Sequence, residues 1–357
     1  MPDESPLSWS LARPGGLHTP LLTENLPGIG GYLSMLPEDF CVHEELPYEP
    51  EGSGDHFFVH IQKRGISTSE VIRCLAEAAG VHQRDVGYAG RKDVHAIATQ
   101  WISMPTEPKE IDDERFSVIE VKQHNKKLRV GHVKQNRFNI RVRDVDQDAL
   151  SKVEALMAIL SEGFPNYFGV QRFGRSGRNL ETANRWIGRG CPRIKGPKFM
   201  VSVVQSAVFN AWLGDRVRDK LFDSVLPGDI LRKRETGGLF MSEDVEIDQA
   251  RLESGEIDVC GPLFGPKMKQ GGDRAKAREE EWVSRLQLTS AARRVIAKFG
   301  AGGRRLARIT AGNFNVEVDG TDLLFCFTLP SGVYATVFLA ELMHPSDGWV
   351  DRVSLSE

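Results

Sequence analysis

The chain has few cysteines and no long apolar run, and both features narrow its possible functions. Its five cysteines are scattered and form no CxxC pair, so neither a zinc ribbon nor a dithiol redox motif is present. An odd, scattered set suits a reducing compartment, and we expect a cytoplasmic protein. No apolar stretch approaches the ~20 residues that cross a bilayer, and the acidic N-terminus precedes no apolar segment, so neither a membrane span nor a secretory signal is predicted.

Motifs for common cofactors and hydrolases are also missing. The sequence contains no GxxxxGK(S/T) loop and no strand–GxGxxG–helix unit, so a nucleotide cofactor is unsupported. It has no HExxH motif, and its nine histidines show no metal-ligand spacing to acids or cysteines. The lack of a GxSxG elbow disfavours a serine hydrolase. We therefore predict chemistry that uses neither a cofactor nor a metal.

Length and composition predict a globular protein of about two domains. The chain has 357 residues, of which 40% are hydrophobic and 27% charged, enough to bury a core. Predicted strands with short helices fill roughly the first 160 residues, the middle is helical and basic, and the C-terminal part returns to strands. This order predicts an α+β fold in which a sheet domain is interrupted by an insertion.

Local signals mark several elements. Ser67 and Glu70 form a capping box that begins a helix, and Gly80 ends it. Over 136–143 apolar and polar residues alternate, which predicts a strand with one apolar face. Apolar residues at helical spacing over 150–160 predict an amphipathic helix, and residues 1–37 are predicted to be mostly loop. Further strands are predicted over 56–62, 98–104, 117–123, 128–131, 314–318 and 323–328, and further helices over 179–187, 201–222 and 333–343.

Basic residues concentrate in two segments although the net charge is −3. Six cations and no acid lie between residues 122 and 137, and eight cations with one acid lie between 166 and 200. The second segment also contains aromatic residues, on which bases can stack while arginines hold phosphates. A polyanionic ligand such as RNA is therefore expected at a local surface. The arginines predicted to contact it are Arg172, Arg175 and Arg178.

One acidic residue stands out as a catalytic candidate. Asp93 directly follows Arg91 and Lys92, with Gly87 and Gly90 just upstream and a predicted strand downstream. Two adjacent cations should favour the ionised carboxylate, which could act as a nucleophile or a base on this constrained turn. Arg91 and Lys92 could keep Asp93 ionised or hold phosphates of the ligand. A surface turn with a local ion pair is the alternative interpretation.

A single acid, basic and aromatic surfaces and no cofactor motif favour cofactor-free chemistry on RNA. Two other interpretations remain open on these residues. The protein could be a non-catalytic RNA-binding or assembly factor that uses the same basic surfaces. It could also be an RNA hydrolase with Asp93 as the base.

Several segments in order along the chain resemble the motifs of the tRNA pseudouridine synthase D (TruD) family. The longest is the NYFGVQRFG stretch, and the resemblance extends from about residue 37 to about residue 343. The matching segments are Asp39–Leu46, Ala89–Ala96, Asn136–Phe138, Asn166–Gly174 and Leu329–Thr336.

This resemblance implies a fold and an activity. The fold would be a pseudouridine synthase fold, a mixed and mostly antiparallel sheet flanked by helices, with an inserted α/β domain specific to the family. Its catalytic domain would comprise 1–161 and 309–357, with 162–308 as the insertion. The activity would be isomerisation of a uridine in tRNA to pseudouridine, at position 13 in bacterial members, without cofactor or metal. We expect a monomer.

The resemblance also implies roles for individual residues. Asp93 falls on the catalytic aspartate of the family, and Phe40 on an aromatic residue that contacts the target nucleotide. Asn136 falls on a polar residue that reads the uracil edge, and Phe138 on the ring beside the catalytic acid. Tyr334 stands where the family often has phenylalanine and keeps a ring for stacking.

Overall fold

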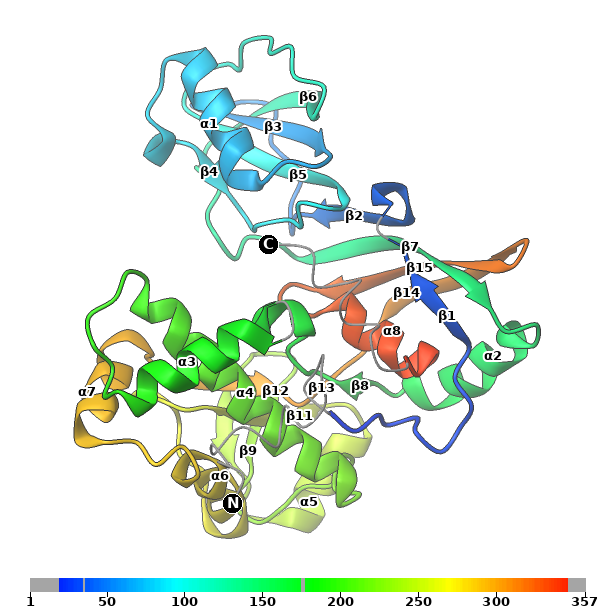
Figure 1. Ribbon diagram of the computed structural model, residues 1–357, viewed down its shortest axis with the longest axis vertical. Helices are drawn as coiled ribbons and strands as arrows, with labels where there is room; N and C mark the ends of the chain where they lie inside the picture. The colour runs from blue at the N-terminus through cyan, green and yellow to red at the C-terminus, as the bar shows by residue number, and fades with distance from the viewer. Residues whose placement is uncertain (1–18, 35, 175–176, 346–357) are drawn as a thin grey trace. The chain divides into compact units, whose positions relative to one another are not determined.

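The computed structural model describes residues 19–34, 36–174 and 177–345 (Figure 1). They form two compact units, each made of segments that are distant in sequence. We call them the sheet unit and the helix-rich unit. The sheet unit comprises 29–150 and 311–335, and the helix-rich unit comprises the described residues of 19–28, 151–310 and 336–345.

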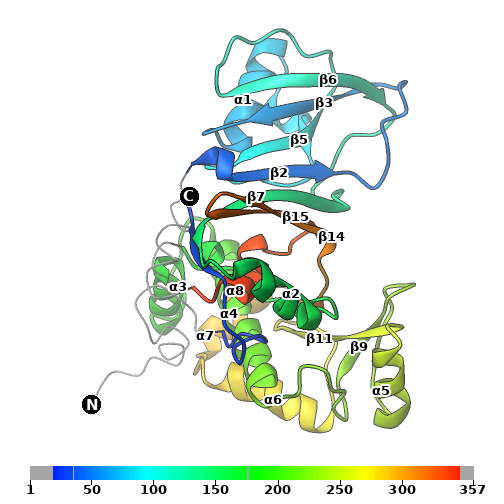
Figure 2. The same cartoon turned by 90° about the vertical axis from the view of Figure 1, so that its right-hand side faces the viewer.

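The sheet unit is built on a nine-stranded sheet. Its main path has the order β14-β15-β7-β2-β5-β3-β6, and Figure 2 shows these strands side by side; β1 also pairs with β7, and β4 with β5. The β2–β5 pair is parallel and the other pairs are antiparallel. The strands are β1 (Gly30–Leu33), β2 (Phe40–Glu45), β3 (His56–Lys63), β4 (Gly87–Tyr88), β5 (Ile97–Met104), β6 (Phe116–His124), β7 (Gln135–Val145), β14 (Gly312–Asp319) and β15 (Asp322–Pro330).

Two local predictions for this unit are confirmed. Helix α1 (Thr68–Ala79) starts at the capping box of Ser67 with Glu70 and ends at Gly80, which adopts the left-handed conformation. Its buried residues pack on β3 and β5. Strand β7 alternates as predicted, because Phe138 and the other apolar residues of that face are buried while the polar residues between them are not. Alternation of apolar and polar residues indicates a strand because successive side chains point to opposite faces and only one face is buried.

One other local prediction is wrong, and one needs an addition. Residues 128–131 form no strand but lead into a turn closed by the bond from His132 N to Arg129 O, since Leu128 N bonds the side chain of Ser103. The segment predicted to be mostly loop at the start of the chain contains a strand, because Gly30–Leu33 forms β1 along the edge of β7. This short strand begins with two glycines of positive φ. Because such glycines are typical of turns, the sequence pattern did not indicate a strand here.

The helix-rich unit packs its longest helix, α4 (Pro197–Arg218), against a four-stranded sheet of order β10-β9-β11-β12. The contact is close at Gly261, where a Cβ would lie 2.3 Å from the Trp212 ring. Among the described residues no helix has both the length and the apolarity to cross a membrane. The other elements are α2 (Ala149–Leu160, which starts in the sheet unit), β8 (Phe164–Pro165), α3 (Arg178–Gly188), β9 (Ile230–Lys233), β10 (Leu239–Met241), α5 (Val245–Glu253), β11 (Ile257–Leu263), α6 (Asp273–Ser284), α7 (Ser290–Phe299), β12 (Gly303–Leu306), β13 (Arg308–Ile309) and α8 (Ala335–Met343).

A buried carboxylate ties the two ends of the helix-rich unit together. Glu341 of α8 is fully buried. Its side chain accepts bonds from Leu22 N at 3.1 Å and Thr23 N at 3.1 Å, and Thr23 Oγ1 lies 2.9 Å away. Burial raises the pKa of Glu341 to about 7. The carboxyl group therefore takes up a proton in the folded protein at a pH where the unfolded chain has lost it.

This raised pKa makes stability depend on pH. Between the ordinary value of 4.5 and about 7 the folded state binds more protons than the unfolded state. The free energy of unfolding should therefore fall by up to about 3 kcal/mol as pH rises through this window and level off above it. Urea unfolding between pH 5 and 8 would measure the trend, and Glu341→Gln should remove this component. An identical pH dependence in the variant would contradict the assignment.

Candidate active site

The loop that carries Asp93 lies between β4 and β5 and is anchored at consecutive residues. Asp93 Oδ1 accepts a bond from His95 N at 3.0 Å, an Asx turn that fixes the carboxylate against its own backbone. Lys92 N donates to Thr68 Oγ1 at 3.1 Å at the start of α1. Gly87 is needed before the loop, because a Cβ there would lie 2.3 Å from Leu128 O. The predicted turn is thus rigidly held, and Asp93 itself is half-buried.

Lys63 supports the same loop from inside the sheet unit. This fully buried lysine, the last residue of β3, donates from Nζ to Asp93 O at 2.5 Å and to Ile66 O at 2.9 Å. Burial lowers its pKa to about 8, although the charge of Asp93 acts in the opposite direction. Lys63 therefore holds the main chain of the loop at Asp93 from the buried side. Lys63 was not identified from the sequence.

Three of the predicted substrate-binding residues share one face of the sheet. In the β2–β7 register Phe40 pairs with Ile140, Val42 with Phe138 and Glu44 with Asn136. Directly paired residues and residues two apart point to the same side. Phe40 and Phe138 make an edge contact, with ring centroids 6.2 Å apart.

Asp39, the residue before Phe40, fixes the backbone where β2 begins. Asp39 forms a two-pronged pair with Arg143, whose Nε and Nη2 lie 2.6 and 3.0 Å from the two carboxylate oxygens. Such pairs fix geometry as well as charge. Phe138 in turn stacks on Phe327 of β15, with centroids 5.5 Å apart. Phe40 and Phe138 are therefore held in place from both neighbouring strands.

Lys92 joins the Asp93 loop to this face. Its Nζ lies 2.9 Å from Glu44 Oε2, an ion pair whose angles depart from hydrogen-bond geometry, and 2.5 Å from Asn136 Oδ1. The Lys92 side chain is 7% exposed and that of Glu44 is 0% exposed. Removal of one partner would leave a buried charge without compensation, so the pair fixes the loop firmly.

The remaining predicted residues of the sheet unit are Tyr334 and Arg91. Tyr334 is half-buried and lies four residues beyond Pro330, the end of β15. Because Leu329 pairs with Asn136, this end of β15 lies beside the end of β7 that carries Asn136. Arg91 is exposed.

The predicted RNA-binding arginines lie in the helix-rich unit. Arg172 donates to Ser206 Oγ at 3.2 Å, and its guanidinium lies over the ring of Phe199. Arg178 is exposed at the first position of α3. Arg175 lies outside the described residues.

The NYFG part of the preceding motif is held by its own unit. Asn210 of α4 accepts from Phe168 N at 2.8 Å and donates to Phe168 O at 2.9 Å. The Arg305 guanidinium lies 4.1 Å from the centre of the Phe168 ring and donates to the side chain of Asn166 at 2.6 Å. These contacts give Asn166 and Phe168 a structural role.

Comparison with known proteins identifies the family of the chain. Residues 17–190 and 196–342 match the sequence model of the family "tRNA pseudouridine synthase D (TruD)". The chain belongs to the TruD family. It is 41% identical over 343 residues to tRNA pseudouridine synthase D of Anaeromyxobacter sp. (strain Fw109-5), covering 91% of this chain and 95% of the relative. It is 36% identical over 334 residues to a tRNA pseudouridine synthase D of Thermus thermophilus, covering 91% and 92%.

A solved structure shows the same fold. The crystal structure of a Methanosarcina mazei protein assigned to TruD superposes with a TM-score of 0.69 at 21% identity, covering 92% of this chain and 96% of that one. The predicted α+β fold of the TruD family, with its mostly antiparallel sheet and inserted domain, is confirmed.

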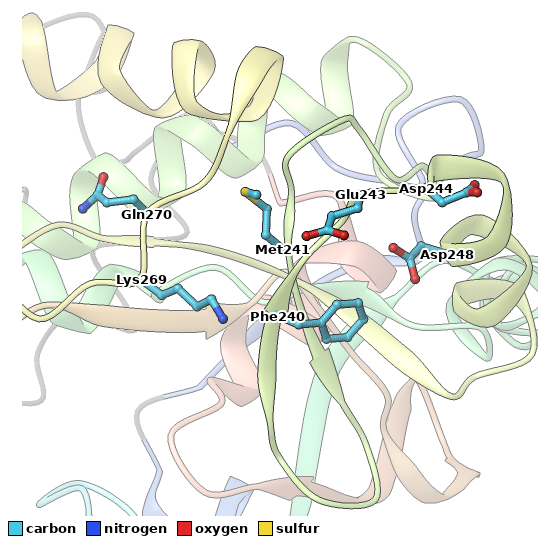
Figure 3. A pocket seen from close by; sticks show the side chains of 7 residues that line it. All are labelled: Phe240, Met241, Glu243, Asp244, Asp248, Lys269 and Gln270. Carbon is cyan, nitrogen blue, oxygen red and sulfur yellow. The ribbon is translucent and has the colours of Figure 1, made fainter.

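The helix-rich unit contains a hollow of about 660 Å³ (Figure 3), whereas the candidate residues around Asp93 belong to the sheet unit. Two of its three acidic residues, Asp244 and Asp248, make hydrogen bonds within the surrounding structure. Asp244 caps α5 by accepting from Glu246 N and Ile247 N, and Asp248 accepts from Ser242 Oγ at 2.8 Å. Among the described residues no group of three or more His, Cys, Asp or Glu side chains could hold a metal.

Lys63 and Glu44 were missed although the sequence carried a signal for each. Lys63 has the same parity on β3 as the fully buried Val59 and Ile61, and Glu44 the same parity on β2 as the buried Val42. A charge at an inward position of a strand must find a buried partner. The partners lie 30 and 48 residues further along the chain, so only the fold identifies them.

Proposed function

We propose that the protein is a tRNA pseudouridine synthase that isomerises a uridine in tRNA, with Asp93 as the nucleophile. The observation that carries this proposal is the position of Asp93, whose loop is bonded through Lys92 to the sheet face that bears Phe40, Asn136 and Phe138. Its TruD relatives bear the name of this activity.

The reaction rearranges one nucleoside without gain or loss of atoms. The bond from C1′ to N1 breaks, the uracil turns over, and a bond from C1′ to C5 forms while the C5 proton is lost to solvent and N1 gains one. The target must first leave its stack, at a cost of a few kcal/mol. Stacking on Phe40 and Tyr334 would offset ~1–3 kcal/mol per contact. Asp93 would attack the nucleoside, and exposed Arg91 would hold a flanking phosphate.

The finer assignments follow the family resemblance. We propose that the target is tRNA position 13 and that the protein acts as a monomer in the cytoplasm, where its tRNA substrate is found. The catalytic domain would comprise 1–161 and 309–357, and 162–308 would form the inserted domain.

Tritium release tests the activity directly. Purified protein is incubated with unmodified tRNA that carries C5-tritiated uridine, and release of tritium with full-length RNA supports the isomerase. RNA binding without release would favour a non-catalytic binding factor. Shortened RNA would favour a hydrolase. Either of these two results would refute the proposal.

Arg178 offers a test of the RNA-binding surface. It is exposed, whereas Arg172 also packs on Phe199, so Arg178→Ala removes charge with little loss of packing. If Arg178 contacts one phosphate, the slope of log K against log salt should become shallower by about 0.7–0.9. Filter binding at several salt concentrations measures this slope.

The matched control is Arg73→Ala, which removes an exposed arginine that already pairs with Glu77 on α1. The slope of this control should stay close to that of the unaltered protein. An unchanged slope in Arg178→Ala would remove this arginine from the interface.

A further inference from the structure

A chain of buried polar contacts ends at the amide of Asn136. Glu44 Oε1 accepts from Trp101 N at 3.1 Å, and Glu44 Oε2 lies 2.9 Å from Lys92 Nζ. Lys92 Nζ then lies 2.5 Å from Asn136 Oδ1. Both charged side chains are almost completely buried, whereas Asn136 is half-buried. The buried ion pair therefore has a further contact at the edge of the site.

The chemistry of an ammonium group decides which way this amide faces. Lysine Nζ has donors and no acceptor, so the atom of Asn136 that faces it must be the carbonyl oxygen Oδ1. The opposite orientation would place two donors against each other beside a buried charge. The other end of the amide, Nδ2, therefore presents its N–H groups away from Lys92. In this arrangement Asn136 is a hydrogen-bond donor to whatever binds beside it.

We propose that Glu44 and Lys92 are positioning residues that make Asn136 a fixed donor to a carbonyl oxygen of the target base, so that the site selects uridine over cytidine. Neither Glu44 nor Lys92 need touch the base. The inference rests on the proposed function in one respect: it requires that a uridine of RNA binds at this site, but not that the uridine is isomerised.

The turnover of the base makes such a donor selective. Exchange of N1 for C5 at C1′ corresponds to a half-turn about the axis through N3 and C6, which also exchanges O2 and O4. Uracil therefore offers a carbonyl oxygen to Asn136 before and after the turn. In this proposal Asn136 lies opposite C4 when the nucleotide first binds. The amino group at C4 of cytosine would then face a donor, and both groups would stay unpaired.

Selectivity can be measured by binding alone. Two tRNAs that differ only in uridine or cytidine at the target position are compared, and every protein carries Asp93→Asn to prevent conversion. The parent should bind the uridine form at least ~10-fold more tightly, since one unpaired buried group costs about that much. A ratio near one in the parent would overturn the proposal.

Two variants then test the role of the ion pair. Lys92→Met combined with Glu44→Gln removes both charges together, which avoids an isolated buried charge. The Asn136 amide can then rotate, and the ratio should fall to within about twofold. Asn136→Asp keeps the Lys92 contact but has no donor, so cytidine should bind at least as well as uridine. A ratio unchanged from the parent in either variant would refute the mechanism.

The control is an equivalent pair on the surface. Lys276 and Glu280 of α6 are 3.7 Å apart, and Lys276→Met with Glu280→Gln should leave the ratio unchanged. An equal fall in this control would show that the effect is not specific to Lys92 and Glu44, and would overturn the proposal. Tritium release by the unaltered protein tests the proposed function separately. A lack of release together with the expected ratios would refute the isomerase and retain the base selection.

Discussion

Asp93→Asn should lower the rate of pseudouridine formation at least ~10³-fold, because an amide is neither a nucleophile nor an anion. The substitution keeps the shape of the side chain and can keep the bond from His95 N to Oδ1, so the loop should stay in place. Binding of tRNA should therefore change by no more than about threefold. Single-turnover tritium release measures the rate, and filter binding with the same tRNA measures the affinity.

The control for this prediction is Asp112→Asn, which neutralises an exposed aspartate of the same unit. Its rate should match that of the unaltered protein. Near-normal turnover by Asp93→Asn would show that Asp93 is not the nucleophile. A loss of tRNA binding comparable to the loss of rate would instead show that Asp93 serves to bind the substrate.

Lys63→Met should lower the rate by ~10–100-fold near neutral pH. Methionine has a similar length but cannot donate to Asp93 O or Ile66 O, so two buried carbonyl groups lose a partner and the catalytic loop loses its support. A displacement of about 1 Å at a catalytic group can cost ~10²-fold in rate. Affinity for tRNA should change less than the rate, because Lys63 is fully buried and cannot reach the RNA.

The pH profile separates this role from a merely structural one. Burial lowers the pKa of Lys63 to about 8, so the rate of the unaltered protein should fall above pH 8, by up to about tenfold per pH unit. Between pH 8 and 10.5 the unfolded chain binds more protons at Lys63 than the folded protein does. The contribution of Lys63 to the free energy of unfolding therefore increases as pH rises through this range. A fall in rate without loss of stability would identify Lys63. A profile of Lys63→Met that still falls at pH 8 would contradict the assignment.

Local sequence signals predicted the elements that depend on neighbours in the chain. The helix after Ser67 is set by a capping box, and strand β7 by burial of alternate residues. Both involve residues within a few positions of one another. Residues 128–131 show the limit of this reasoning, because their apolar pattern resembles a strand while their backbone bonds elsewhere.

The arrangement of the site depends on register, which local patterns do not contain. The sequence indicated Phe40, Asn136 and Phe138 through the family resemblance, but only the β2–β7 register places them on one face. A shift of one residue would turn each strand over and separate them. The register also brings Glu44 opposite Asn136, where Lys92 can reach both.

The sequence by itself determined the family and the α+β class and proposed Asp93 as the acid, because motifs and alternation are properties of residues close together in the chain. The tertiary structure decided which buried lysine supports that acid and which way the Asn136 amide faces. Those two features arise because a buried charge must be compensated by whichever group the fold brings within bonding distance, however far away it lies in the sequence.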